Sequence, residues 1–485
     1  MRHKPNCDVR SRLAERQAII RTFKNSEDGS LTIFALFLIP MMLILGGMAV
    51  DFMRYESKRA LIQDTADRAS LLAANLEFTQ SGDAATVVDD YFTKANLDQY
   101  LTGPAIVSEN INGRTVEVNA KQPLNTFFLN YIGIDELEAP ANSVAKQGVG
   151  NVEISLVLDI SGSMRLPTHD ANGTATGQSK MQAMQAAAKT FINTALQDSN
   201  KDRVSLNLVP YSEHVNIGKD MFDRLTTNEL HNFSHCIDFD TADFEQSGIS
   251  MTQEYRQAQH IDHWSTGNEL NTTSCPSSDF QEVTAMSQDR SALLSQIDQF
   301  EPYTMTSIFL GMKWGLALLD PSARSLVGPG ADAAFAGRPA AYSTDANPND
   351  TRKVLVVMTD GQNTETTRVR EEFYNTPSHY AHWASIPTET WFARNTFTGN
   401  HSISDIEEVF YQNAEGNQLL KASCDAAKAQ GVQVFAVAFE APEDGEAVMA
   451  DCATSVNHYF NTNGDDLSAV FEAIAEQVTD LRLTQ

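Results

Sequence analysis

Hydrophobic positions divide the chain into an uninterrupted apolar stretch, a helical stripe that follows it, and a long region of alternating short runs. From Leu31 to Val50 no residue is charged, and a helix of this length spans the roughly 30 Å of a bilayer core. We therefore predict a transmembrane helix over 31–53, preceded by a cytoplasmic tail over 1–30. The alternatives are a cleaved signal peptide, whose apolar stretch would be shorter, and a buried core helix. Basic residues lie on both sides of the stretch, so the positive-inside rule leaves its orientation open.

Beyond the apolar stretch, hydrophobic residues recur at helical spacing between charged ones to about residue 78, which predicts that the helix continues in amphipathic form. A second helix is expected over 84–95. The pair Asn112-Gly113 separates two alternating segments, a pattern typical of a tight hairpin, here over 106–120. A short helix and one more strand follow in 124–147. Residues 54–148 are thus predicted to form a small α+β unit of pilin-like plan, joined to the rest by Gly148-Val149-Gly150.

From residue 149 to 485, β-branched apolar runs alternate with amphipathic segments, which predicts a doubly wound α/β domain with a mostly parallel sheet covered on both faces. The predicted strands are 152–158, 203–210, 353–358 and 432–439. The predicted helices are one capped by Ser179, and those at 283–300, 308–319, 404–429 and 466–482. Two polar stretches, 218–282 and 361–403, are too long for simple connections and are interpreted as insertions.

The overall charge restricts the class of partner. The chain has 485 residues, too many for one ordinary domain, and a net charge of −28. Binding to nucleic acid needs clusters of Lys and Arg on one surface. The composition therefore argues against a nucleic-acid-binding protein and is compatible with a surface that binds cations or repels anionic surfaces.

The cysteines after the apolar stretch are even in number: Cys236, Cys275, Cys424 and Cys452. They allow three disulfide pairings, of which 236–275 with 424–452 is the simplest. Disulfides would place this part of the chain outside the cytoplasm. Free buried thiols remain the alternative, and zinc is less favoured because no pair has CxxC spacing.

Side chains with oxygen atoms gather where the predicted strands end. Asp159-Ile-Ser161-Gly-Ser163 follows the first strand of the α/β domain, Thr359-Asp360-Gly361 follows a later one, and Thr306 precedes a helix. Ligands of such sheets bind outside the carboxyl ends of the strands. Two carboxylates in one crevice repel each other unless a cation lies between them, and oxygen ligands with water suit Mg²⁺. The alternative is that the serines only cap a helix and the aspartates form turns.

These motifs resemble a von Willebrand factor A domain with a metal-ion-dependent adhesion site: DISGSM after a buried strand, Thr306 in a second loop, and MTDG after a later strand. The resemblance implies a Rossmann-like fold. It also implies that Ser161, Ser163 and Thr306 bind a divalent ion directly, while Asp159 and Asp360 act through water. An open position on the ion would accept an acidic group of a partner.

Nearly the whole chain is also similar to TadG-like proteins of Tad/Flp pilus assembly, through Gly29-Ser30, VDFMRY after the apolar stretch, an Ala-rich helix over 60–75, Cys424 with Cys452, and the closing LRLT. This resemblance implies a single-pass protein of the bacterial inner membrane with its C-terminal part in the periplasm. Pilus components or other Tad assembly proteins are the implied partners. Pilin-type leaders are often cut after a glycine with glutamate five residues on. Here Phe34 stands at that place, so we expect the anchor to be retained.

The predicted function is metal-dependent binding in pilus assembly or surface adhesion, without catalysis. A hydrolase of phosphatase type using the same crevice is the alternative, although such enzymes need a second aspartate where Ser161 stands. A second metal site in 218–282 is a further hypothesis, and its candidate ligands are His231, His235, Cys236, His260, Asp262 and His263. Aromatic residues of the second insertion indicate either a recognition surface near the ion or a small core: Phe373, Tyr374, Tyr380, Trp383, Trp391, Phe392 and Phe397.

Overall fold

The structure is a computed structural model that describes residues 8–25, 30–75, 84–110, 113–148, 151–170, 173–200, 202–328, 337–343, 351–395, 401–464, 466–479 and 482–484. The chain forms two compact units, one of Met1–Gly148 with Arg482–Gln485 and the other of Val149–Leu481. The division falls at the predicted joint, of which Val149 and Gly150 lie outside the described residues. Gly29, Asn112 and Phe397, which carry other predictions, also lie outside them.

Within its described residues, the first unit contains three α-helices and a small antiparallel sheet. Its helices are α1 (Asp8–Asn25), α2 (Ser30–Ala74) and α3 (Ala84–Lys94). Its strands are β1 (Ile106–Asn110), β2 (Gly113–Asn125), β3 (Glu136–Gly148) and β17 (Arg482–Thr484). The sheet order is β1-β2-β3-β17 with antiparallel pairs, so the predicted hairpin over 106–120 is confirmed.

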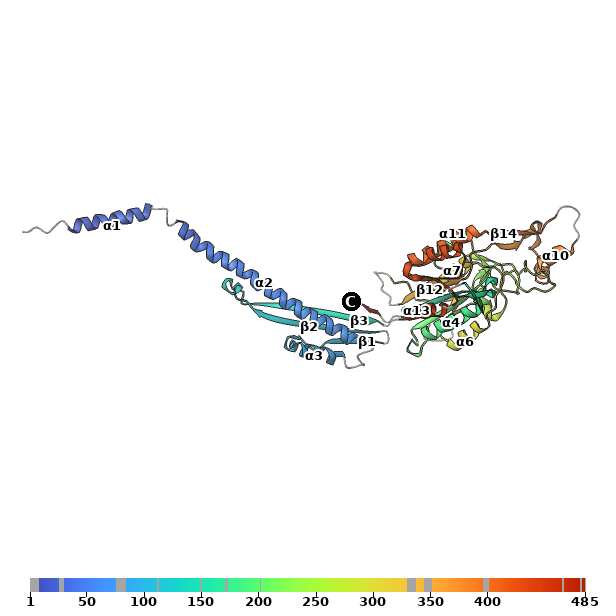
Figure 1. Cartoon of the computed structure of the whole chain (residues 1–485), viewed down its shortest axis with the longest axis horizontal. Coiled ribbons are helices and arrows are strands. Elements are labelled where there is room, and N and C mark those ends of the chain that lie inside the picture. Colours follow the sequence, from blue (N-terminus) through green and yellow to red (C-terminus); the bar gives the residue numbers. More distant parts are fainter. Residues whose placement is uncertain are drawn as a thin grey trace, which may run out of the picture. The chain divides into compact units, whose positions relative to one another are not determined.

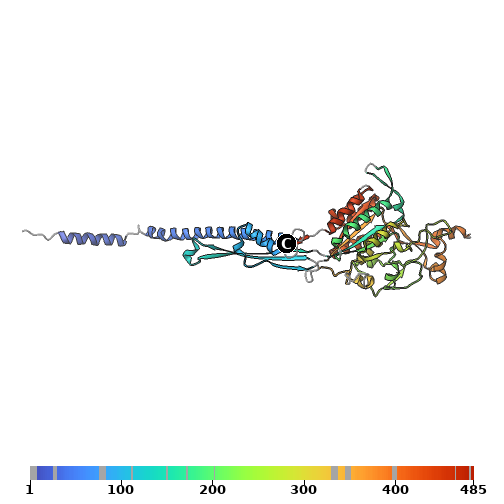
Figure 2. The same cartoon turned by 90° about the horizontal axis from the view of Figure 1, so that it is seen from below.

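One continuous helix, α2, contains both the apolar stretch and the amphipathic stripe (Figure 1). Among the described residues, α2 is the one helix that is long and apolar enough to cross a membrane, so it is a candidate membrane anchor. Further along α2, Ile62, Ala66, Ala69 and Ala73 are buried against α3 and the sheet, and α2 runs along that sheet (Figure 2). The change from exposed to buried apolar residues along α2 matches the predicted change of pattern.

The last residues of the chain belong to the first unit, which corrects the predicted domain end at 485. Arg482 pairs with Gly148 and Thr484 with Lys146, so β17 is the edge strand beside β3. Three residues are too short to give a strand pattern that could be recognised in the sequence.

The second unit is built on a six-stranded sheet of order β11-β7-β4-β12-β15-β16. The strands are β4 (Val152–Asp159), β7 (Val204–Tyr211), β11 (Thr284–Ser287), β12 (Arg352–Thr359), β15 (Gln433–Phe439) and β16 (Tyr459–Thr462). All neighbours are parallel except the pair β11 and β7. The order reverses between β4 and β12, the place where doubly wound sheets bind ligands. The predicted α/β class with a mostly parallel sheet is confirmed.

Helices cover both faces of this sheet (Figure 1). One face is covered by α4 (Lys180–Ala195), α6 (Arg290–Asp298) and α13 (Leu467–Thr479). The other is covered by α7 (Ile308–Ala317), α11 (Asn413–Ala429) and α12 (Glu443–Cys452). Ser179 caps α4 as predicted, with Gln182 completing a capping box.

Two predicted helices begin later than expected because strands occupy their first residues. The segment predicted as helix 283–300 starts with the edge strand β11, and α6 begins at Arg290. The segment 404–429 starts with β14 (Glu407–Tyr411), which pairs with β13 (Thr366–Val369), and α11 begins at Asn413. In both places long-range strand pairing overrides a local apolar pattern that also fits a helix.

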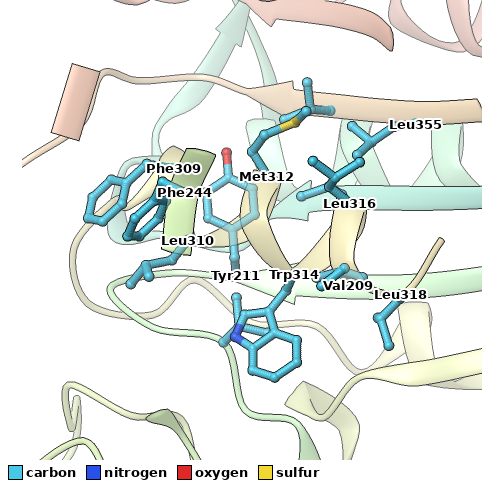
Figure 3. Close-up of a cluster of buried hydrophobic side chains, with 14 of the residues drawn as sticks. Val209, Tyr211, Phe244, Phe309, Leu310, Met312, Trp314, Leu316, Leu318 and Leu355 are labelled. Carbon is cyan, nitrogen blue, oxygen red and sulfur yellow. The ribbon is translucent and has the colours of Figure 1, made fainter. Parts of the chain in front are cut away.

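The insertion over 218–282 is folded against α7. Figure 3 shows Phe309, Met312, Trp314 and Leu316 of α7 among Tyr211 and Leu355 of the sheet and Phe244 of the insertion. At the centre Lys313 is fully buried, and its Nζ donates to the carbonyl oxygens of Asp243, Gln246 and Gly248 at 2.7–2.8 Å. One ammonium group thus satisfies three backbone acceptors of the insertion.

Each disulfide joins cysteines that are neighbours among the four along the chain, 39 and 28 residues apart. Cys236 is bonded to Cys275 within the first insertion, and Cys424 of α11 is bonded to Cys452 of α12. The predicted nearest-neighbour pairing is therefore the one in the structure.

We predict that Lys313→Met lowers the free energy of unfolding of the second unit by about 3 kcal/mol or more, because it leaves three buried carbonyl oxygens without a donor. Chemical denaturation followed by tryptophan fluorescence measures this, since all four tryptophans, Trp264, Trp314, Trp383 and Trp391, lie in that unit. Lys421→Met is the control: that lysine is exposed, its ion pairs are with Asp425 and Asp451, and about 0–1 kcal/mol is expected. Equal effects of the two substitutions would contradict the role assigned to Lys313.

Candidate functional site

Three loops meet at the edge of the sheet where the strand order reverses. Asp159 ends β4, Thr359 ends the neighbouring strand β12, and Thr306 lies just before α7. Because β4 and β12 are parallel neighbours, their carboxyl ends deliver Asp159 and Asp360 to one crevice. The third loop is attached by an isolated bridge between Ser161 and Tyr303.

The first loop is shaped by Asp159 and by the close approach of the third loop. Asp159 is fully buried, and its Oδ1 accepts from the backbone N–H of Ser161 at 2.7 Å. The N–H of Gly162 donates to the carbonyl oxygen of Thr304 at 2.7 Å, and a Cβ at Gly162 would lie only 2.9 Å from that oxygen. A glycine between the two serines is therefore required by packing.

All five predicted site residues come together. Ser163 Oγ donates to Asp360 Oδ1 at 2.6 Å, and Ser161 Oγ lies 3.1 Å from Ser163 Oγ. Thr306 borders the same place, because a Cβ at Gly361 would lie 3.7 Å from Thr306 Oγ1 and 3.8 Å from Ser163 Oγ. Three segments separated by more than fifty residues each thus present hydroxyl and carboxylate oxygens to one another.

The two carboxylates are in an environment that disfavours their negative charge. Burial, together with the nearby charge of Asp360, raises the pKa of Asp159 to about 7. Burial also raises the pKa of Asp360, although the ammonium group of Lys180, 3.1 Å from Asp360 Oδ2, opposes this rise. Thr359 Oγ1 donates to Asp159 Oδ2 at 2.7 Å. The two buried carboxylates thus have one neighbouring ammonium group, that of Lys180, and their negative charge is only partly compensated.

The donor set fits a hard divalent cation. Its members are two serine hydroxyls, one threonine hydroxyl and two carboxylates, all oxygen ligands of the kind that Mg²⁺ prefers. With no thiol or imidazole among the five residues, the set does not favour zinc. A cation here would also relieve the repulsion between Asp159 and Asp360.

A cavity of about 610 Å³ opens beside these oxygens, lined by Ser163, Thr306 and nine other residues. Its wall includes Arg165, the exposed side chains of Leu166 and Trp264, and Met305. Sequence analysis missed this wall. Trp264 lies in the first insertion. Packing between loops that are distant in sequence brings it to the cavity, and such packing leaves no pattern in the sequence.

A buried ion pair supports the third loop and was also missed. Glu213 is fully buried, and its Oε2 lies 3.0 Å from His263 Nε2 and accepts from Thr304 Oγ1 at 3.1 Å. Burial raises the pKa of Glu213, but the charge and hydrogen bond of His263, together with the charge of His214 and the hydrogen bond from Thr304, outweigh this effect and lower the pKa overall. Burial lowers the pKa of His263, but the charge and hydrogen bond of Glu213, with the other nearby carboxylates, outweigh the effect of burial, so that the pKa is raised overall. The pair ties the first insertion to the loop that carries Thr306.

The hypothesis of a second metal site in the first insertion is wrong. Among the residues that the structure describes, no group of three or more His, Cys, Asp or Glu side chains is arranged to hold a metal. Cys236 is in a disulfide, His263 pairs with Glu213, and His260 Nδ1 contacts Ser234 Oγ. Asp262 accepts from four backbone N–H groups of its own loop, those of Trp264, Ser265, Asn271 and Thr272.

The aromatic residues of the second insertion form a small core of their own. Tyr374 and Trp383 are buried with Val369, Ile406 and Ile261, and Tyr380, Trp391 and Phe392 pack around them. These aromatic residues do not line the cavity beside Ser163 and Thr306. Of the two interpretations, the small core is therefore the one that the described residues support.

Comparison with known proteins gives one family match. Residues 29–76 match the family described as "Putative Flp pilus-assembly TadE/G-like". Comparison with curated proteins gives no match. The similarity covers the segment that contains all of α2.

Solved structures give distant similarities. The pilus adhesin SpaC from Lactobacillus rhamnosus GG is 13% identical, with 77% of this chain and 34% of that chain covered and a TM-score of 0.34. The vWF domain of the type V pili tip protein Mfa5 from Porphyromonas gingivalis is 13% identical, with coverages of 68% and 95% and a TM-score of 0.33. The PilB minor pilin from Streptococcus sanguinis is 13% identical, with 78% of each chain covered and a TM-score of 0.33. The chain spans about a third of the length of SpaC, and none of these similarities assigns a residue or an activity.

We predict that His263→Gln destabilises the second unit most at mildly acidic pH. The stabilisation from His263, whose pKa is raised on folding, is fully present below about 6.5 and is lost as the pH rises through the raised value. The contribution of Glu213, whose pKa is lowered, is present above about 4.5 and is lost as the pH falls through the lowered value. Between these limits the substitution should cost about 3–5 kcal/mol, as for a broken buried ion pair.

Urea denaturation at several pH values, followed by tryptophan fluorescence, measures the difference between wild type and variant. The difference in the free energy of unfolding between wild type and variant should shrink from pH 6 to pH 9. His401→Gln, at the exposed pair with Asp405, should show a small difference throughout. A difference for His263→Gln that is constant with pH would argue against a charged pair.

Proposed function

We propose that this chain, whose residues 29–76 are similar to the TadE/G-like family of Flp pilus assembly, is a membrane-anchored protein that binds acidic groups of pilus components through a divalent cation. The observation that carries the proposal is the contact of Ser161, Ser163 and Asp360 above the buried Asp159, at the point where the strand order reverses. The anchor is α2, and the second unit lies in the periplasm. In this proposal the protein acts in assembly or surface adhesion by binding, without catalysis.

The cation, most simply Mg²⁺, would be held by the hydroxyl oxygens of Ser161, Ser163 and Thr306, with Asp159 and Asp360 acting through water. This division follows the von Willebrand factor A domain, which these loops resemble. The buried carboxylates supply the negative charge that attracts the ion, and Lys180 compensates only part of it. An ion bound to few charged ligands remains electrophilic on its open side and accepts a further oxygen.

The surroundings of the site support an acidic partner. The cavity beside Ser163 and Thr306 offers Arg165, which attracts a carboxylate, and the apolar surfaces of Trp264, Leu166 and Met305. The chain as a whole has a net charge of −28 and repels acidic proteins at long range. A bound cation would give this surface a local positive centre for an acidic side chain.

We predict that the full chain in detergent binds Mg²⁺ at one site and that Asp360→Asn weakens this binding at least tenfold. Asparagine keeps the size of the side chain and an acceptor for Ser163 but removes the charge. Isothermal titration calorimetry measures the affinity. Saturation to about 100 times Kd should also stabilise the second unit by about 2.7 kcal/mol.

Asp298→Asn is the matched control, since Asp298 is exposed and paired with Lys189 away from the site. It should bind Mg²⁺ like the wild type. If Asp360→Asn bound Mg²⁺ as tightly as the wild type, the proposed cation site would be contradicted.

We predict that cross-linking in membranes from pilus-producing cells captures pilus components with the wild type and at least tenfold less with Asp360→Asn. A chelator should reduce wild-type capture to the same level, while Asp298→Asn should behave as wild type. Equal capture by the wild type and Asp360→Asn would contradict a role of the ion in binding. Hydrolysis of p-nitrophenyl phosphate by the wild type that is lost in Asp159→Ala would favour the alternative, a hydrolase.

A further inference from the structure

We infer that the loop over 126–135, which joins β2 to β3, is a second membrane contact that inserts into the headgroup–acyl boundary beside the point where α2 leaves the bilayer. The inference rests on the proposed anchor and goes beyond it, because it assigns a lipid-binding surface to a segment distant from the anchor in sequence. We call residues 126–134 the tip loop.

The tip loop is held against α2 by a buried carboxylate. Asp51 is fully buried, and its Oδ2 accepts from the backbone N–H groups of Phe128 at 2.7 Å and Leu129 at 3.0 Å. The N–H of Phe127 lies 3.1 Å from Oδ1. Three successive N–H groups that no strand or helix uses are thus satisfied by one side chain of α2, so the loop has a defined position along that helix.

This position lies within the end of the apolar stretch. A Cβ at Gly47 would overlap the ring of Phe128, so the ring lies directly on the helix backbone at a residue without a side chain. Gly47 is about 24 Å along α2 from Leu31 at about 1.5 Å per residue, and the hydrocarbon core is about 30 Å thick. The residue in contact with Phe128 therefore lies inside the predicted span, close to its exit. Figure 1 shows this end of the β2–β3 hairpin beside α2.

The outer side of the tip loop is apolar. Its exposed large hydrophobic side chains are Phe127 (63%), Tyr131 (78%), Ile132 (54%) and Ile134 (40%), and Asn130 is exposed among them. The sequence from Thr126 to Ile134 contains no charged residue. Four large exposed hydrophobic groups on one uncharged loop form a patch that is unfavourable in water and typical of a contact surface.

The composition and the neighbours of the patch favour lipid as the occupant. Aromatic residues are enriched where proteins cross the membrane–water boundary, and Tyr131 combines an apolar ring with a hydroxyl suited to that boundary. The Arg54 guanidinium lies 4.2 Å from the ring centroid of Phe127 and donates to the carbonyl oxygen of Asn125. An arginine one turn beyond the apolar stretch is placed to meet lipid phosphates. A protein partner would have to bind at the depth of the bilayer surface.

The test uses the full chain in phosphatidylethanolamine–phosphatidylglycerol liposomes, with Cys7→Ser and one nitroxide label at Ile132→Cys. Electron paramagnetic resonance gives the ratio of accessibility to oxygen, which concentrates in lipid, over accessibility to a water-soluble nickel chelate. Val144→Cys is the matched control: Val144 is 49% exposed in the same sheet, and its neighbour Ser143 contacts Ser70, about 28 Å along α2 from Asp51. Leu38→Cys reports on the anchor itself.

We expect the ratio at Ile132 to exceed that at Val144 several-fold and to lie below that at Leu38. A ratio at Ile132 equal to that at Val144, with Leu38 in lipid, would overturn the inference and leave the anchor intact. Protection from both reagents, with spin–spin broadening between chains, would assign the patch to a second copy and also overturn it. A water-exposed Leu38 would overturn the anchor and this inference together.

Discussion

The second unit depends on a buried carboxylate at the place in the sheet where the strand order reverses, between β4 and β12. Asp159 is fully buried at the end of β4, hydrogen-bonded to Thr359 of β12 and to its own loop. Its neighbour Asp360 is buried as well and is only partly neutralised by Lys180. Burying two acids at one edge costs free energy unless a positive charge compensates them. Even without a ligand, the burial and mutual repulsion of these two carboxylates therefore constrain the fold around them.

Contacts outside the site hold its loops in place. The first insertion is fastened to α7 by Lys313 and to the third loop by Glu213 and His263. It also brings Trp264 to the cavity wall. The second insertion packs around a small aromatic core that also includes Ile261 of the first insertion. Both insertions are thus part of the packed second unit, and the first of them supplies the surface next to the candidate ion site.

The first unit uses the same kind of interaction for another purpose. Asp51 accepts three backbone N–H groups and thereby attaches the end of a hairpin to a helix. A carboxylate so close to the apolar stretch would be costly if it faced lipid, and these hydrogen bonds compensate its burial. The interaction ties the small antiparallel sheet to the candidate anchor at the end of its apolar stretch.

The sequence by itself determined the elements whose causes are local. The apolar stretch before Asp51, the capping of α4 by Ser179 and the buried strands around Asp159 and Asp360 follow from periodicity and side-chain chemistry within short windows. Parallel strand ends meet at one edge of a sheet, so the grouping of Ser161, Ser163 and Asp360 was predictable from motif positions as well. Thr306 belongs to this predicted group because it precedes a helix and matches the von Willebrand factor A motif.

Only the tertiary structure decided what depends on partners distant in the chain. The edge strand β11, the pairing of β14, and the return of residues 482–484 to the first unit arise from strand pairing that overrides weak local patterns. The same holds for Lys180, Glu213 and Trp264, whose places near the site come from packing between segments that the sequence keeps apart. Burial and long-range hydrogen bonding select these arrangements, and neither leaves a periodic mark on the residues concerned.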